Sequence, residues 1–459
     1  IFFRHHVCIS HQIFRLLMRA VRKHAFSKFR FLVVFIAVIG VLLCAVVWSL
    51  RAAPVTGIVL PATASQIANE QALPSESQDS DHGTAPALGA VDSMQDVCEQ
   101  CNLAGKCLAG GQCSCLQGWT GPTCGVLDLV PGTAQPAFHK ASRAGVTTWG
   151  ASAAQAPTGE WYLFASRMVH GCGILTWSSN SEIVQATAPD VMGPYTIVKT
   201  LMPSFSHGPH LVRAPNGSYI LFHIGAGDGI SGVPAEACAE GSTIRPFKRP
   251  HAKKVAPGEV PSGDFWIGMA VAEALTGPWR RYGPLLGLRD GALEDMITNP
   301  SVAILPNGTA LLYYRTTHRE RKRTQRHIGV AVADHWAGPY RRLSRVPLFE
   351  ALAEDPYVWQ TGGVFHMLVH DSSSAGYSNP QKYAGKHAFS RDGLHWTVSP
   401  DVPYSATVAL ANGTLVLYAR RERPELVVIA GRPAALITAI SAQPWTRRDH
   451  GFTMVQQLR

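Results

Sequence analysis

The chain has 459 residues, including 42 glycines and 31 prolines, and a formal net charge of +10. This length exceeds one ordinary domain, and the abundant turn residues between short apolar runs favour an all-β repeat protein. The charge is unevenly placed, in residues 1–30 and in a basic run at 319–326 that is typical of a solvated loop. No aromatic residues interleave with that run, so we expect no nucleic-acid partner.

The first predicted element is a membrane-spanning helix at residues 31–50, which carry no charge. A helix needs about 20 apolar residues to cross a bilayer core. Basic residues fill the preceding tail, 1–30, and are absent between Arg51 and Lys106, which places the N-terminus in the cytosol. A cleaved signal peptide is the alternative, but its apolar core is usually about 7–15 residues. We therefore expect a single-pass type II signal anchor, with the remainder of the chain in the Golgi or secretory lumen or at the cell surface.

Residues 51–97 are rich in Ala, Ser, Pro, Gln and Asp and show no periodicity. Such a segment buries too little apolar surface to offset the entropy of ordering. It is predicted to be a disordered stalk.

Six of the ten cysteines follow within residues 98–124: Cys98, Cys101, Cys107, Cys113, Cys115 and Cys124. A dense, even set beyond a membrane anchor predicts disulfides; zinc is the alternative, but the segment has neither His nor paired CxxC spacing. The pattern C-x-C-x-x-G-W-x-x-x-x-C that ends at Cys124 resembles the EGF-like module. The resemblance implies the pairs Cys98–Cys107, Cys101–Cys113 and Cys115–Cys124, without calcium. Cys172 and Cys238 remain and can pair, tying a long loop to the first repeat.

One unit recurs over residues 135–459. Segments 208–222 and 299–314 each contain a residue before proline, an apolar run, an Asn-Gly turn and a second apolar run. Asn-Gly closes a tight hairpin between twisted strands. Related hairpins occur near Thr147, Glu354 and Arg423, and Gly-Pro-aromatic motifs at 193–195, 277–279 and 338–340 introduce an outer strand, with Gln443-Pro444-Trp445 as a weaker match. Four-stranded antiparallel blades of this kind predict an all-β, five-bladed β-propeller.

A further Asn-Gly hairpin at 408–417 lacks the leading proline and is interpreted as an elaboration between blades four and five. A six-bladed count is the alternative. Asn216, Asn307 and Asn412 lie in N-x-S/T sequons at these turns. The turn alone explains asparagine there, and N-glycosylation is an added expectation for exposed luminal turns.

Alignment of the hairpins places Gly150, Gly208, Asn299, Asp355 and Arg423 at equivalent positions, where the inner strands open toward a central funnel. Glycoside cleavage uses two carboxylates that flank the bond. Asp355 is the main catalytic candidate, and the second carboxylate is sought among Glu354, Glu294, Asp295 and Glu422. Any single acid could instead cap a loop or lie in a solvated turn. Sugar contacts are predicted for Trp149, His207, Asn299 and Arg423, and neither cofactor nor metal is expected.

Residues 135–445 resemble the five-bladed propellers of the arabinanase, invertase and levansucrase group, especially glycoside hydrolase family 43-like proteins. The resemblance rests on Glu354-Asp355-Pro356, on the Gly-Pro-aromatic motifs and on segment 385–396, which supplies the further binding candidate His387. Segment 172–181 is also similar to the first blade of membrane-anchored eukaryotic members. The resemblance implies a glycan or polysaccharide as partner. Hydrolases of the group begin the first blade with a catalytic Asp, and here that position is Gly150.

Two functions follow. The first is a membrane-anchored, hydrolase-like enzyme acting on luminal or extracellular glycans. The second is a non-catalytic glycan-binding or adhesion protein with a degenerate hydrolase pocket. A carboxyl pair at roughly 5–10 Å across an open pocket supports hydrolysis, whereas acids that point outward or pair with Arg423 favour binding. A purely structural scaffold predicts a funnel plugged by apolar side chains.

Overall fold

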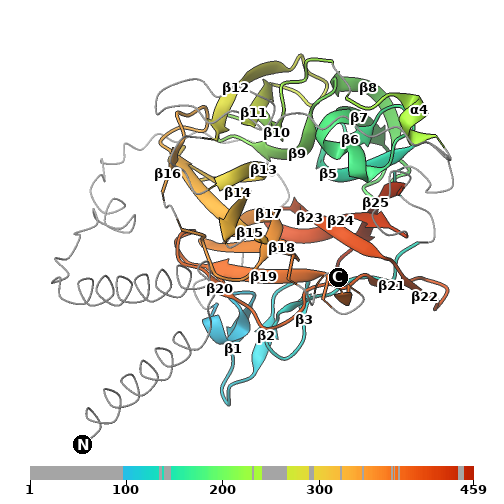
Figure 1. Ribbon diagram of the computed structural model, residues 1–459. Helices are drawn as coiled ribbons and strands as arrows, with labels where there is room; N and C mark the ends of the chain where they lie inside the picture. Colours follow the sequence, from blue (N-terminus) through green and yellow to red (C-terminus); the bar gives the residue numbers. More distant parts are fainter. Residues whose placement is uncertain are drawn as a thin grey trace, which may run out of the picture. The chain divides into compact units, whose positions relative to one another are not determined.

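Five antiparallel sheets of three or four strands form the blades of the propeller (Figure 1). The computed structural model describes residues 97–133, 137–138, 146–229, 232–239, 266–288, 294–320, 323–343, 346–373, 376, 378–380, 383–442 and 449–459. In this part of the chain no helix combines the length and apolar character needed to cross a membrane. The predicted tail, the anchor at 31–50 and the stalk up to residue 96 lie outside the described residues.

Four sheets have four strands each, ordered from inner to outer as the chain runs. Blade one contains β5 (Thr147–Gln155), β6 (Trp161–Met168), β7 (Ser181–Ala188) and β8 (Thr196–Met202). Blade two contains β9 (His207–Arg213), β10 (Tyr219–Ile224), β11 (Trp266–Ala272) and β12 (Arg280–Gly287). Blade three contains β13 (Glu294–Ile304), β14 (Ala310–Glu320), β15 (Arg323–Ala333) and β16 (Arg341–Arg342). Blade four contains β17 (Ala353–Thr361), β18 (Val364–Asp371), β19 (Gly385–Ser390) and β20 (Thr397–Val398).

Blade five contains β23 (Arg420–Ile429), β24 (Arg432–Ser441) and β25 (Gly451–Gln457), and residues from before the first blade lie beside it. Val130 N donates to Gln457 O at 2.8 Å, and Phe138 and Thr453 exchange backbone hydrogen bonds at 3.4 Å. The two ends of the propeller are therefore joined within one blade.

The inner strands form a closed ring. Strand β5 contacts β9, β9 contacts β13, β13 contacts β17, β17 contacts β23, and β23 contacts β5 again. The hairpin of β21 (Thr407–Ala409) and β22 (Leu415–Leu417) forms a separate two-stranded sheet. The five-bladed prediction is thus confirmed, and the six-bladed alternative is wrong because this hairpin contributes no inner strand.

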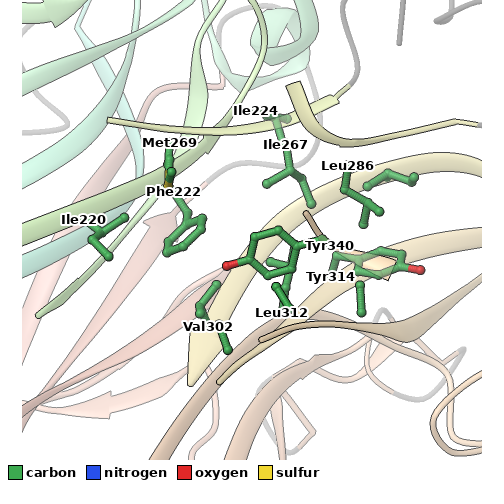
Figure 2. Packing of buried hydrophobic residues seen from close by; sticks show 14 of the residues in the cluster. Ile220, Phe222, Ile224, Ile267, Met269, Leu286, Val302, Leu312, Tyr314 and Tyr340 are labelled. Carbon is green, nitrogen blue, oxygen red and sulfur yellow. The ribbon is translucent and has the colours of Figure 1, made fainter. Parts of the chain in front are cut away.

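Apolar wedges between neighbouring blades hold the ring together. Strand β10 sends Ile220, Phe222 and Ile224 toward blade three, and its alternate residues Tyr219 and Leu221 toward blade one. Figure 2 shows the first of these wedges, where side chains of blade two face those of blade three. Each fully buried side chain of this size contributes about 1.5–3 kcal/mol relative to exposure.

The Gly-Pro-aromatic motifs lie between the third and fourth strands of blades one to three, as predicted. Their tyrosines, Tyr195 and Tyr340, are buried against the apolar wedges. The weaker match at 443–445 lies outside the described residues.

The EGF-like module precedes the propeller and packs on it. It contains η3 (Glu99–Cys101), β1 (Gly105–Cys107), β2 (Cys113–Cys115), β3 (Trp119–Thr120) and β4 (Val126–Leu127). Its disulfides join Cys98 to Cys107, Cys101 to Cys113 and Cys115 to Cys124, the pairs that the resemblance implies.

Trp119 of the module is buried with Tyr357 and Trp359 of blade four. Asn102 donates to the Asp401 carboxylate at 3.3 Å. Apolar burial and a polar anchor together dock the module on blade four.

A fourth disulfide joins Cys172 to Cys238. Cys172 precedes the short helices η4 (Ile174–Thr176) and α3 (Trp177–Asn180), and Cys238 ends α4 (Ala235–Cys238). Asn180 holds the same two segments together, since its side chain donates to Val233 O at 2.7 Å and accepts from Val233 N at 2.9 Å. The loop between blade-one strands is therefore tied to the loop of blade two.

Candidate functional site

The five residues aligned from the sequence share one unusual backbone conformation. Gly150, Gly208, Asn299, Asp355 and Arg423 have φ of 70°, 63°, 53°, 58° and 56°. In each case the register between the first two strands of the blade shifts there. A bulge of this kind turns the strand and re-aims the side chain at that position. Five equivalent bulges therefore direct the five aligned positions, one from each blade, toward the centre of the ring.

Arg423 fills the space that the two glycines leave. A Cβ added to Gly150 would lie 2.7 Å from Arg423 Nε, and one added to Gly208 would lie 3.1 Å from its Nη2. The guanidinium thus lies where the resemblance places the first-blade carboxylate. The absence of a side chain at both positions makes room for it.

Asp355 is held by three donors. Asn299 Nδ2 donates to its Oδ1, the backbone N of Arg423 donates to Oδ2 at 3.1 Å, and Arg423 Nη1 donates to Oδ1 at 3.4 Å. The residue is 4 % exposed. A carboxylate with its lone pairs engaged in this way is poorly placed to attack a substrate.

Glu354 is also ion-paired. Its Oε2 lies 3.2 Å from Arg326 Nε and 3.5 Å from Arg315 Nε, and its Oε1 lies 3.3 Å from His370 Nδ1. Burial raises the pKa of Glu354, but the His370 hydrogen bond and the two arginines outweigh it and hold that pKa well below the ordinary value. Burial lowers the pKa of His370, yet Glu422, Glu354 and Asp355 raise it to about 9. At neutral pH this cluster is a carboxylate surrounded by cations.

Glu422 differs from the other two acids. Burial raises its pKa above the ordinary value. Its Oε1 has no hydrogen-bond partner among the described residues, and Arg420 Nη1 lies 4.0 Å from it. Glu422 is thus the acid in the funnel that most readily keeps a proton.

Asp355, His370 and Glu422 each offer one ligand atom within 4.8 Å of the others, a spacing that a metal ion can bridge. The charged neighbours argue against this use. Arg423 already neutralises Asp355, and protonated His370 points its Nδ1 at Glu354. A further cation would meet two fixed positive charges.

The inner-strand residues open into a pocket of about 410 Å³. The short helices η4 and α3 supply part of its wall through Ile174, Leu175 and Trp177. Trp177 lies 5.2 Å from the His207 ring, and His207 Nδ1 is 2.7 Å from Ser181 Oγ. Burial and the charge of Arg423 lower the pKa of His207, so this histidine is neutral.

Seven of the predicted site residues line this pocket: Trp149, His207, Asn299, Glu354, Asp355, Glu422 and Arg423. Glu294 and Asp295 begin β13, and their side chains lie outside the described residues. The structure places His387 elsewhere. It is fully buried, 4.5 Å from the Trp119 ring and hydrogen-bonded to His366 at 3.1 Å. It lies on the third strand of blade four, which does not reach the funnel.

The sequence did not predict Arg315 and Trp177, which line the pocket, or His370, which contacts Glu354 beside it. Arg315 pairs across the hairpin with Thr298, and His370 with Glu354. Counting the strand register back from the hairpin turns could therefore have identified Arg315 and His370. Trp177 lies within the segment 172–181 that carried part of the resemblance, but no periodic signal distinguishes it as a pocket residue.

Residues 94–124 match the family model of the EGF-like domain. The sequence matches no curated protein.

The structure is similar to a family 117 glycoside hydrolase of the marine bacterium Zobellia galactanivorans, with 13 % identity over 72 % of this chain and 89 % of that one and a TM-score of 0.47. It is similar to the catalytic domain of a Coprinopsis cinerea GH62 α-L-arabinofuranosidase, with 10 % identity over 72 % and 98 % and a TM-score of 0.46. It is also similar to a thermostable family-43 glycoside hydrolase, with 11 % identity over 72 % of this chain and 92 % of that one and a TM-score of 0.44. Likeness at this level concerns the general arrangement of the blades and does not identify a substrate. The chain thus joins an EGF-like module to a five-bladed propeller that resembles glycoside hydrolase structures.

Proposed function

We propose that the funnel pocket binds a glycan without cleaving it. The observation that carries this proposal is the position of Arg423, which covers Gly150 and pairs with Asp355. The first-blade acid of the resembling hydrolases is absent, and the inner-ring acid that remains is engaged by three donors. Glu354 is paired with two arginines and a histidine. Neither acid is available as a nucleophile or base.

The pocket has the chemistry to hold sugar hydroxyls. Arginine and asparagine donate hydrogen bonds, carboxylates accept them, and an indole ring offers an apolar face. Asn299, Arg423 and Trp177 supply these groups, and all line the same cavity. Its volume lies within the range of about 300–1,000 Å³ common for small-ligand sites. Arg423 is fixed by its ion pair with Asp355 and Asn299 by its hydrogen bond to the same carboxylate, which reduces the ordering cost of binding.

Hydrolysis is the second candidate because of Glu422. A general acid must keep its proton near neutral pH, and burial raises the pKa of Glu422 in that direction. Its neighbour Asp355 would have to release Arg423 to act as the partner carboxylate. The two acids lie on adjacent inner strands, β23 and β17, rather than across the pocket.

A panel of plant, fungal and animal glycans, incubated with the full chain, separates the two functions. Binding is measured by retention and cleavage by release of reducing ends. We expect retention without release, and at least tenfold weaker retention for Trp177→Ala. Reducing ends released by the wild-type chain but not by Glu422→Gln would replace binding with hydrolysis. Glu350→Gln, at an exposed position outside the pocket lining, serves as the matched control.

We further propose that residues 31–50 anchor the chain as a type II membrane protein and that the funnel faces the lumen or the exterior. This rests on the charge asymmetry of the sequence and agrees with the four disulfides. Protease digestion of sealed microsomes should spare residues 97–459 and remove an N-terminal tag. Digestion of the propeller in sealed vesicles would contradict this orientation.

A further inference from the structure

A second cavity lies at the far ends of the inner strands, between the EGF-like module and the turns of blades four and five. Its volume is about 530 Å³. Asp355 stands near the start of β17 and Gln360, which lines this cavity, near its end. At about 3.3 Å per residue, five residues of strand separate the two by roughly 17 Å. This seam cavity is therefore distinct from the funnel pocket.

The lining of the seam cavity is cationic. Lys106 of the module and Arg432 of blade five both line it, and no Asp or Glu does. Neither has a carboxylate partner among the described residues. Arg432 Nη1 donates instead to Gln117 Oε1 at 3.3 Å. Two unpaired cations facing one concave space attract an anion.

A buried histidine also lines this cavity. His366, which is 1 % exposed, lines it, and its Nε2 has no hydrogen-bond partner within the described part of the chain. An unsatisfied buried polar atom costs about 1–3 kcal/mol, so a partner supplied by a ligand is favourable.

The other ring nitrogen fixes how His366 can take part. His366 Nδ1 lies 3.1 Å from His387 Nε2, so one of the two donates to the other. An oxyanion in the cavity favours the tautomer with the proton on His366 Nε2. His387 then carries its proton on Nε2 and donates to His366. The stacked histidine pair thus presents one N–H to the cavity while both rings stay neutral.

We propose that the seam cavity is a second binding site, for a small ligand that carries an oxyanion, either a carboxylate or a sulfate group. Lys106 and Arg432 balance the charge of that group, and His366 donates a hydrogen bond to it. Because both the module and the propeller contribute side chains, the ligand also fastens the module to blades four and five.

Calorimetric titration of the full chain with glucuronate, sodium sulfate and glucose tests this site. We expect saturable binding of glucuronate and no binding of glucose. Sulfate binding as tight as that of glucuronate would assign the site to any oxyanion, and weaker binding would assign it to acidic sugars. Lys106→Ala/Arg432→Ala should weaken binding at least tenfold, and His366→Phe several-fold. Both cations stand at the rim of the cavity, so the double variant keeps the disulfides and the buried wedge.

Trp177→Ala, which alters only the funnel, should leave glucuronate binding unchanged. This separates failure of the seam site from failure of the proposed glycan function. Unchanged affinity in the double variant, equal binding of glucose, or no saturation by either anion would overturn the proposal. In the last case ordered water alone satisfies His366.

Discussion

The two ends of blade four bury ionisable groups in opposite ways. At the funnel end, Glu354 stays charged because two arginines and protonated His370 surround it, and Asp355 is paired with Arg423. At the seam end, His366 and His387 are stacked between aromatic rings, and burial keeps both neutral. The strands of blade four thus carry paired ions at one end and uncharged imidazole rings at the other. Burial is tolerated either when the charge is matched or when it is removed.

The largest expected effect comes from unpairing the funnel. Arg423→Ala leaves Asp355 buried with only its hydrogen bonds from Asn299 and the backbone, and it should cost about 3–5 kcal/mol of unfolding free energy. Urea denaturation measures this. The double variant Asp355→Asn/Arg423→Ala should lose less than the sum of its parts, because no unmatched charge remains. A loss below about 1 kcal/mol for Arg423→Ala would show that the ion pair is not what stabilises this end.

The pH dependence of stability should separate the two ends. Burial lowers the pKa of His366 to about 3, so its contribution is complete above the unfolded value near 6.5 and is lost as the pH falls. The acids around His370 raise its pKa to about 9, so its contribution is complete below 6.5 and is lost as the pH rises through 9. Each group changes the unfolding free energy by up to about 1.4 kcal/mol per pH unit.

Urea midpoints recorded from about pH 5 to about pH 9.5 test this assignment. His366→Phe should reduce the pH dependence of the urea midpoint only on the acid side. His370→Gln should reduce it only on the alkaline side. His223, buried in blade two with its pKa lowered to about 4, keeps part of the acid slope in both variants. An acid slope unaffected by His366→Phe would contradict the neutral pair at the seam.

A substitution at Gly150 in blade one tests whether Arg423 needs the space beside this glycine. Gly150→Ala should cost about 2 kcal/mol, because a left-handed residue with a side chain is strained and the new Cβ would push Arg423 away. Gly308→Ala is the matched control, since Gly308 is also left-handed and has nothing within 4 Å. It should cost about 1 kcal/mol. Equal losses in the two variants would mean that Arg423 does not need the space.

The smallest effect is expected at the exposed turns. Asn307 Oδ1 accepts from Thr309 N at 3.0 Å, a contact that aspartate preserves. Asn307→Asp should therefore change stability by less than about 0.5 kcal/mol while removing the sequon. Loss of a glycan is read from the electrophoretic mass before and after enzymatic deglycosylation. If Asn307→Asp leaves the electrophoretic mass unchanged, Asn307 carries no glycan and serves only to form the turn.

The repeat was predictable because hairpin chemistry is local. Asn-Gly turns and Gly-Pro-aromatic motifs give blade number and strand register without knowledge of the ring. The register of the hairpins also aligned five positions that the structure shows to be left-handed. Glycine, asparagine and aspartate, which occupy four of them, favour that conformation, whereas arginine has no such preference.

The direction of long side chains was not predictable. No local pattern shows that Arg423 reaches across to Gly150, because that contact joins blades five and one. His387 was placed in the funnel on the strength of its segment, and its partners Trp119 and His366 come from the module and another strand. Docking of the EGF-like module depends on tertiary packing that spacing does not encode.

The joining of the two chain ends in blade five also sets an order of assembly. Asp128 and Arg459 interact although they stand 331 positions apart. During synthesis from the N-terminus, the disulfide-bonded module and the early blades are made while their last partner strand does not yet exist. Until β25 is made, Val130 and Phe138 lack their backbone partners Gln457 and Thr453, and unpaired strand edges invite aggregation. A chain halted before Gly451 would leave blade five with only two of its strands.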